Sequence, residues 1–346
     1  RDCMVGNNSA SVVADAYIKG LRGYDIETLW EALKHDANSQ LPRTASGRVA
    51  YEEYNKLGYV PYDVKINESA ARTLEYAYDD WCIAQMAKEL GKEDDYKVYT
   101  ERALSYINVF DGHTKFFRGK RMDGNWDSPF NPFEPGRAYT EATAWQYRFF
   151  VPHDVNGLIQ LFGGKDEFTS QLDSLFVVES KVDGHMSDIT GLIGQYAHGN
   201  EPSHHMAYLY NYVGQPWKTQ AMTRRILSEM YQPTPEGISG NEDCGQMSAW
   251  YIFNCMGFYP TCPSSNIYAI GSPGLESVEM TLGNGKKVSV TTENYSKQNV
   301  YIQAMYLNGK EYNKTYITYD DIKNGAEIKF VLGTNPNKSW GTADES

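Results

Sequence analysis

Apolar residues recur every three or four positions over most of the chain, which is the spacing of one face of an α-helix. The clearest example is 69–90, where Leu74, Ala77 and Trp81 lie on one face and Gly91 ends the pattern. The same spacing predicts helices at 9–21, 25–35, 69–90, 94–109, 138–150, 154–162, 166–177, 203–213, 217–231 and 246–256. The protein is therefore predicted to be mainly α-helical.

From Ile267 onward the pattern changes to alternation of apolar and polar residues, as in SVEMTL, KVSVTT and AEIKFVL. This period of two is typical of strands that have one buried face. Turn residues at 283–285 (Gly-Asn-Gly) and 308–309 (Asn-Gly) separate the alternating runs and predict hairpins. We expect a helical portion over 1–264, followed by a small antiparallel β-region over 265–346.

The predicted helices follow one another through alternately short and long links. Such a succession forms either a solenoid or a closed toroid of helix pairs, and the sequence shows no fixed-period repeat, which disfavours the solenoid. Two long links, 112–135 and 183–205, have no periodicity and mix Gly, Pro, Asp and aromatic residues. Long loops in compact domains are usually functional, and Trp126 and Asp127 in the first link are candidate substrate contacts.

Composition narrows the class of ligand. The net charge is −12, and no cluster of Lys and Arg is present, which argues against binding to a nucleic-acid backbone. A neutral or cationic ligand, or one held through a metal, is favoured instead. Aromatic residues make up 14% of the chain, with 27 Tyr and 7 Trp, and such rings contact sugars but also fill the cores of helical proteins. No hydrophobic run is long enough to span a membrane.

The stretch EGISGNEDCGQMSAW, residues 236–250, is the densest in candidate chemistry. Three glycines surround the adjacent carboxylates Glu242 and Asp243. Glycines allow backbone conformations that are closed to other residues, and a carboxylate held on such a turn is a candidate general base. The alternative is structural: Asp243 caps a helix that begins near Gln246, and Glu242 is solvated.

Two further motifs place carboxylates at helix edges. In AYTEATAWQY, Glu141 lies between Tyr139 and Trp145, and apolar neighbours would raise its pKa as a general acid requires. The alternative is a first-turn glutamate stabilised by the helix dipole. A general acid and a general base on separate loops are what glycoside hydrolysis needs. Glu141 and Asp243 are candidates for these two roles.

The run HGNEPSHH, residues 198–205, resembles a zinc motif only superficially. Gly199 and Pro202 exclude the continuous helix that the His-Glu-x-x-His arrangement requires. Oxygen ligands from Asn200 and Glu201 better match a calcium or sugar site, and a plain helix N-terminus is the alternative.

Together, EATAWQY, NEPSHH and GNEDCGQMSAWYIFNCMGFYP resemble glycoside hydrolase family 92, a family of calcium-dependent, exo-acting, inverting α-mannosidases. The resemblance covers nearly the whole chain. It implies Glu141 as general acid, Asp243 as general base with Glu242 as the fallback, Glu201 with Asn200 as ligands of Ca²⁺, and His204 and His205 in the mannose site. This chain differs from the family pattern at 142–143, where it has Ala-Thr and many members have Gly-Asn.

The resemblance also implies an (α/α)6 toroid, incomplete in this chain, and an N-terminal β-sandwich domain of the same protein that this chain lacks. The implied enzyme acts on mannose-containing glycans outside the cytoplasm, as a secreted, periplasmic or cell-surface protein. The alternatives are another toroid glycosidase, a polysaccharide lyase, or a non-catalytic helical scaffold. A lyase would release unsaturated products, and a scaffold would release no mannose.

Overall fold

The computed structural model describes residues 4–39 and 47–342, which form two compact units. Of the described residues, unit 1 comprises 4–39, 47–189, 193–196 and 263–265, and unit 2 comprises 190–192, 197–262 and 266–342. These units do not follow the predicted boundary between residues 264 and 265, because unit 2 joins helices to the C-terminal strands. The predicted division into two domains stays a prediction.

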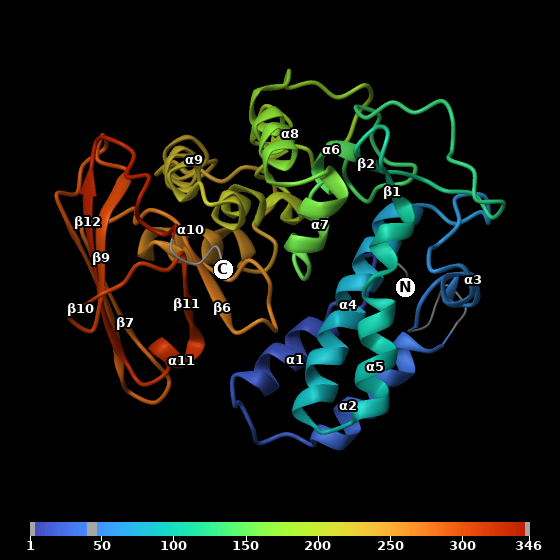
Figure 1. Ribbon diagram of the computed structural model, residues 1–346, viewed down its shortest axis with the longest axis horizontal. Coiled ribbons are helices and arrows are strands. Elements are labelled where there is room, and N and C mark those ends of the chain that lie inside the picture. The colour runs from blue at the N-terminus through green and yellow to red at the C-terminus, as the bar shows by residue number, and fades with distance from the viewer. Residues whose placement is uncertain (1–3, 40–46, 343–346) are drawn as a thin grey trace. The chain divides into compact units, whose positions relative to one another are not determined.

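Unit 1 is helical. Its elements are α1 (Ser9–Ile18), α2 (Ile26–Ala37), α3 (Tyr51–Leu57), α4 (Ser69–Glu89), α5 (Glu93–Arg102), the 3-10 helix η1 (Ser105–Val109), strands β1 (Phe110–Asp111) and β2 (Phe116–Phe117), α6 (Ala144–Tyr147), α7 (Val155–Phe162) and α8 (Lys165–Val177). The long helix α4 is buried along most of its length and packs against α1 and α5 (Figure 1).

A buried charge cluster fixes α4 in unit 1. The Asp80 carboxylate accepts hydrogen bonds from Arg48 at 2.8 Å, Arg102 at 3.1 Å and the Tyr54 hydroxyl at 3.2 Å. Asp80 and Arg48 are almost completely buried, and buried charges are tolerated when they are paired in this way. Because Arg102 is the last residue of α5, the cluster ties α5 to the middle of α4.

The N-terminus of α4 in turn holds the segment that leads to Glu141. The backbone N–H groups of Ala70 and Ala71 donate to the Ala138 carbonyl at 3.1 and 3.0 Å, and that of Glu68 donates to the Arg137 carbonyl. The first N–H groups of a helix lack partners within it, so an incoming carbonyl satisfies them.

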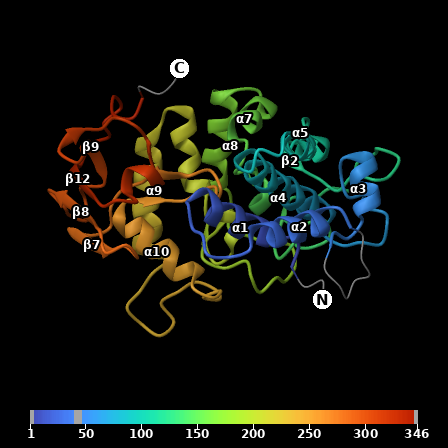
Figure 2. The ribbon, with the colours of Figure 1, turned by 90° about the horizontal axis from the view of Figure 1, so that it is seen from below.

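Unit 2 combines helices with two sheets. It contains the 3-10 helices η2 (Glu201–Ser203) and η3 (Met206–Val213), helices α9 (Pro216–Glu229), α10 (Gln246–Met256) and α11 (Tyr319–Ile322), and strands β5 (Phe258–Tyr259), β6 (Ile267–Ile270), β7 (Ser277–Thr281), β8 (Lys287–Glu293), β9 (Tyr301–Leu307), β10 (Lys310–Glu311), β11 (Tyr316–Thr318) and β12 (Ala326–Gly333). Short strands β3 (Leu192–Ile193) and β4 (Tyr196–Ala197) lie where the chain passes between the units. Helices α9 and α10 lie beside the larger sheet (Figure 2).

The larger sheet has the strand order β10-β9-β12-β8-β7. The hairpins predicted at 283–285 and 308–309 are confirmed, because β7 pairs with β8 and β9 pairs with β10 in antiparallel fashion. Strand β12 is inserted between β9 and β8 and runs parallel to β8, so the predicted antiparallel β-region is confirmed except at the β12–β8 pair. A hairpin turn sets the direction of its own two strands, and no turn connects β12 to either of its neighbours.

Most predicted helices are confirmed, with shorter or altered ends. The prediction over 138–150 was largely wrong, since only α6 is helical there. The prediction over 203–213 gave the correct region, but the turns are 3-10 rather than α. The mainly helical class is confirmed, and the toroid stays a prediction. Among the described residues, no helix combines the length and apolar character needed to cross a membrane.

Candidate active site

The turn before α10 carries the two adjacent carboxylates in an unusual backbone conformation. Asp243, Cys244 and Gly245 are successively left-handed, with φ of 54°, 54° and 104°. Residues other than glycine rarely adopt this region, although Asp tolerates it better than most. A strained turn of this kind persists only where its surroundings hold it, and such turns are often found at functional sites.

The two carboxylates of this turn have different partners. Glu242 accepts hydrogen bonds from the Ser248 hydroxyl at 2.7 Å, the Ser248 N–H at 3.2 Å and the Gly245 N–H at 2.5 Å. The hydroxyl of Ser248 and the N–H of Gly245 lower the pKa of Glu242. Asp243 is exposed, and its carboxylate has no hydrogen bond within residues 4–39 and 47–342. The alternative in which Asp243 caps α10 was therefore wrong, because Glu242 binds the start of the helix.

Two glycines bring the turn 239–245 against the turn 199–205. A Cβ atom on Gly240, whose φ is 71°, would lie 2.8 Å from the Gly199 carbonyl oxygen and 2.9 Å from the Thr190 hydroxyl. A Cβ atom on Gly199 would lie 1.9 Å from the same hydroxyl. Only residues without a side chain permit this approach. The motif around Asn200 and the motif around Asp243 thus belong to one site in unit 2.

Asn200 and Glu201 lie at the start of η2. The Asn200 side-chain oxygen accepts from the Glu201 N–H at 3.2 Å, and Pro202 follows within the first turn. Glu201 is half-buried, and its charge contributes to the pKa of Tyr259, which burial raises to about 12. The Thr190 hydroxyl beside Gly199 is buried and lacks a hydrogen-bond partner among the described residues.

A hydrogen-bonded chain connects His204 to the first residue of α10. His204 Nε2 lies 2.9 Å from the His198 carbonyl oxygen and must donate to it, so Nδ1 of the neutral ring accepts from Gln246 Nε2 at 3.1 Å. The Gln246 amide also donates to the Tyr259 hydroxyl at 2.9 Å. Burial lowers the pKa of His204 to about 4, against a smaller opposing effect of the Asp243 charge. His204 is therefore neutral near pH 7.

Both ring nitrogens of His204 are engaged with the protein, which favours a positioning role over direct contact with a ligand. Because Gln246 is the first residue of α10 and its N–H donates to the Asp243 carbonyl at 3.1 Å, the hydrogen bonds of His204 and Gln246 hold the turn 239–245. The adjacent His205 is buried. The predicted substrate contacts of His204 and His205 stay predictions.

Aromatic rings complete the support of this site. The Trp250 indole N–H donates to the His204 carbonyl at 3.1 Å, and its ring packs edge-on against His198 at 4.5 Å. His198 Nε2 lies 2.7 Å from the Tyr231 hydroxyl, which donates to the Met247 carbonyl at 3.0 Å. Since a hydroxyl that donates its proton to a carbonyl can only accept from His198, this histidine is protonated on Nε2.

Glu141 lies in unit 1 and is also left-handed, with a φ of 51°. Helix α6 begins after it, at Ala144, and is capped by Thr143 through a reciprocal box with Gln146. Glu141 thus precedes the helix, so the alternative of a first-turn glutamate was wrong. At Thr143, one of the two positions where the chain differs from the family resemblance, the side chain caps α6.

Trp126 and Asp127 also lie in unit 1. The Trp126 ring packs near Lys120, whose ammonium lies 5.1 Å from the ring centroid. The Asp127 carboxylate pairs with Arg121 at 2.9 Å and Arg137 at 3.4 Å, and it lines a cavity of about 30 Å³ together with the segment 136–139 that leads to Glu141. Their predicted contacts with substrate stay predictions.

The structure therefore joins Asn200, Glu201, His204, Glu242 and Asp243 in one site of unit 2. Trp126, Asp127 and Glu141 lie in unit 1, and the roles of Glu141 and Asp243 as acid and base stay predictions. Within the part of the chain that the structure describes, no three His, Cys, Asp or Glu residues group as metal ligands.

Sequence reasoning missed the residues that support the site, above all Gln246, Tyr231 and Tyr259. These residues lie on helical or strand patterns and look like ordinary core positions. The only available signal was a glycine next to each acidic motif, at positions 199 and 240.

Comparisons with known proteins agree on one family. Residues 1–334 match the family model described as "Glycosyl hydrolase family 92 catalytic domain". An "Uncharacterized secreted glycosidase" of Arthroderma benhamiae is 32% identical over 97% of this chain and 46% of its own length.

Two solved structures are closer in sequence. The family GH92 alpha-mannosidase BT3965 from Bacteroides thetaiotaomicron is 48% identical, with a TM-score of 0.93 over 99% of this chain and 45% of its own. The family GH92 inverting mannosidase BT2199 from the same species is 40% identical, with a TM-score of 0.90 over 99% and 48%. The chain spans about half the length of these relatives.

We predict that Gly240→Ala destabilises the protein more than Gly285→Ala. Both glycines have positive φ, 71° and 77°, but a Cβ atom on Gly285 meets nothing within 4 Å. The control change should therefore cost only the left-handed penalty of about 1–2 kcal/mol. At Gly240 the clash with Gly199 should add about 1–3 kcal/mol. Urea unfolding measures both losses, and equal losses would contradict the close approach of the two turns.

Proposed function

This chain belongs to glycoside hydrolase family 92, and from that membership we propose that it forms part of an exo-acting α-mannosidase, which hydrolyses terminal α-mannosides of glycans with inversion. Similarity to a family GH92 alpha-mannosidase and to an inverting mannosidase supports the reaction. The observation that carries the proposal is the exposed Asp243 carboxylate, held on a strained turn while its neighbour Glu242 is used to bind the helix.

Asp243 is the proposed general base. In an inverting reaction one carboxylate removes a proton from water as the water attacks the anomeric carbon. This role requires a carboxylate whose oxygens are not committed to the protein, and the Asp243 side chain has no hydrogen bond among the described residues. The Gln246 N–H donates to the Asp243 carbonyl and the Gln246 side chain is held by His204, so the backbone that carries the carboxylate is fixed, which favours a productive geometry.

Glu141 is the proposed general acid, which protonates the departing glycosidic oxygen. Its left-handed backbone lies two residues before Thr143, the cap of α6, and α4 holds the preceding segment through the Ala138 carbonyl. Glu141 is half-buried, and the residues that follow it, 142–149, are all buried, so the carboxyl borders the apolar interior of unit 1. An acid that must carry its proton near neutral pH requires such an environment.

We propose that Asn200 and Glu201 bind Ca²⁺. The possible ligand atoms in this region are oxygens: a carboxylate, an amide and the buried Thr190 hydroxyl, which has no hydrogen-bond partner among the described residues. Oxygen ligands match the preference of a hard cation. They are fewer than the six to eight oxygens that Ca²⁺ takes, so water and sugar hydroxyls would supply the others. When bound, the ion would attract the hydroxyls of the mannose ring. Trp126, Asp127 and His205 are the proposed sugar contacts, and His204 positions α10.

The proposal also covers the cellular location of the enzyme and its partner domain. The name of the fungal relative includes the word secreted, which supports a secreted, periplasmic or cell-surface location for this protein. The N-terminal β-sandwich domain that the family resemblance implies is proposed as the partner of this chain.

The full-length protein should release mannose from at least one of the α-1,2-, α-1,3-, α-1,4- and α-1,6-linked mannobioses. Early proton NMR spectra should show β-mannose, because inversion reverses the α configuration. EGTA should abolish the release, and added Ca²⁺ should restore it. Absence of mannose from every linkage would reject the mannosidase. Initial α-mannose would reject inversion, and full activity in EGTA would reject the metal.

Glu141→Gln should lower kcat/KM on the preferred mannobiose by about 100- to 10,000-fold, the usual contribution of general acid catalysis. On 2,4-dinitrophenyl α-mannoside the loss should be much smaller, because this leaving group departs without protonation. Parallel assays of both substrates separate the acid role from damage to the fold. Equal losses on the two substrates would remove Glu141 from that role.

Asp243→Asn and the matched change Glu242→Gln should separate the two adjacent carboxylates. Loss of the base should lower kcat/KM by about 100- to 10,000-fold on both substrates. In Glu242→Gln the amide oxygen can still accept from Ser248, and only the hydrogen bond from the Gly245 N–H to the other carboxylate oxygen is lost, so activity should fall much less than in Asp243→Asn. Circular dichroism checks that both variants fold. The reverse order of activities would make Glu242 the base.

A further inference from the structure

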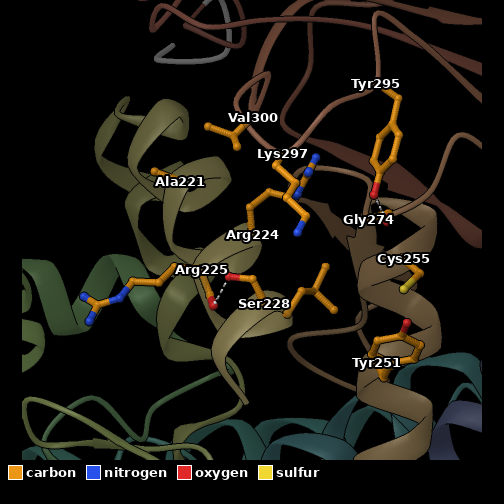
Figure 3. Close-up of a pocket in the computed structure, with 11 residues that line it drawn as sticks. Ala221, Arg224, Arg225, Ser228, Tyr251, Cys255, Gly274, Tyr295, Lys297 and Val300 are labelled. Atoms are coloured by element: carbon orange, nitrogen blue, oxygen red, sulfur yellow. Dashed lines mark hydrogen bonds between the residues drawn. The ribbon is translucent and has the colours of Figure 1, made fainter. Parts of the chain in front are cut away.

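Unit 2 contains a cavity of about 490 Å³, and none of the predicted catalytic or metal-binding residues lines it. It lies among α9, α10, the turn before β7 and the loop between β8 and β9 (Figure 3). The lining residues are Ala221, Arg224, Arg225, Leu227, Ser228, Tyr251, Cys255, Gly274, Tyr295, Lys297 and Val300. Three of these are cationic and none is acidic, although the whole chain carries a net charge of −12.

Arg224 is the most deeply placed of the three cations. It is only 9% exposed, and its two terminal nitrogens donate to the carbonyls of Pro273 and Ser296, each at 2.8 Å. No carboxylate pairs with it among the described residues, and burial lowers its pKa. A buried cation that contacts only neutral acceptors keeps most of its charge uncompensated, which favours an anion nearby.

The other two cations differ in their partners. Lys297 is exposed and has no ion pair within the described chain. Arg225 pairs with Glu229 at 2.8 Å, and Figure 3 shows its guanidinium directed away from Arg224 and Lys297. The uncompensated positive charge of the cavity therefore comes from Arg224 and Lys297. Arg225 serves as an internal control.

Two tyrosines supply aromatic surface in the same cavity. Tyr251 and Tyr295 are 37% and 38% exposed. The Tyr295 hydroxyl donates to the Gly274 carbonyl at 2.7 Å, and its ring packs on the Arg224 guanidinium, 5.2 Å from the centroid. The Tyr251 ring packs against Tyr231 at 5.0 Å. Rings fixed in this way present apolar faces of the kind that sugar rings contact, and the volume lies in the range of small-molecule pockets.

We propose that this cavity binds a sugar that carries an anionic substituent, a phosphate or a carboxylate. Lys297 and Arg224 contact the anion, and Tyr251 contacts the sugar ring. The site is separate from the proposed catalytic residues, although the choice of a sugar as ligand rests on the proposed glycosidase function. A neutral sugar would not pair with the charges of Arg224 and Lys297, and a free anion would not pack on the ring of Tyr251.

Isothermal titration calorimetry of the full-length protein tests the proposal with four probes: glucose 6-phosphate, glucuronate, glucose and inorganic phosphate. These sugars lack the mannose configuration, so binding at the proposed catalytic site does not confound the result. We expect glucose 6-phosphate, glucuronate or both to bind more tightly than glucose and inorganic phosphate. The two charged sugars distinguish a phosphate from a carboxylate substituent.

Lys297→Gln should weaken binding of the charged sugar about tenfold, which corresponds to about 1.4 kcal/mol. Arg225→Gln should leave it unchanged, because that guanidinium is already paired. Tyr251→Ala should weaken the charged sugar but not inorganic phosphate, with thermal unfolding measured to confirm the fold. Lys297→Gln should not alter kcat/KM on neutral mannobioses, so this test is independent of the mannosidase assay.

Three results would overturn the proposal. The first is no binding of either charged sugar to the wild type. The second is equal binding by the wild type and Lys297→Gln, which would remove the charge from recognition. The third is inorganic phosphate binding as tightly as glucose 6-phosphate, which would leave no role for the sugar ring.

Discussion

The close approach of Gly199 and Gly240 is the constraint on which the site in unit 2 depends. It leaves no space for a Cβ atom at either position, and it brings together turns that are about forty residues apart in the sequence. One turn carries Asn200 and Glu201, and the other carries Asp243. Without this contact the oxygen-rich turn and the exposed carboxylate would belong to separate surfaces. The absence of two side chains thus determines which functional groups share a site.

A hydrogen-bonded chain through a neutral histidine keeps this arrangement rigid. His204 can connect the His198 carbonyl to Gln246 only while one ring nitrogen donates and the other accepts. Burial disfavours the charged ring and so preserves that tautomer at neutral pH. Within this series of hydrogen bonds, the polar groups of His204 and Gln246 are paired with one another. The side chain of Gln246, the first residue of α10, thereby fixes the start of the helix. Rigidity of the support compensates for a turn whose own backbone conformation is unfavourable.

Local signals decided what could be predicted from the sequence. Helix α4 and the hairpins β7–β8 and β9–β10 were predicted correctly, because an apolar face or a two-strand turn is contained in a short stretch of residues. The direction of β12 was not, because its neighbours in the sheet are remote in sequence. The candidate carboxylates were visible beside glycines. The roles of Gln246 and Tyr259 were not, since a hydrogen bond between distant side chains leaves no periodic trace.

The adjacent residues Glu242 and Asp243 show why a motif alone does not assign a chemical role. In the sequence the two carboxylates have the same neighbours and the same glycine frame. In the structure, a proton taken up by Glu242 would weaken hydrogen bonds that hold Ser248 and the start of α10, whereas no hydrogen bond among the described residues depends on the Asp243 carboxylate. In the proposed mechanism, proton transfer at Asp243 would therefore leave the support of the site intact. The left-handed turn makes this difference between Glu242 and Asp243 possible, because it directs the two consecutive side chains to different surroundings.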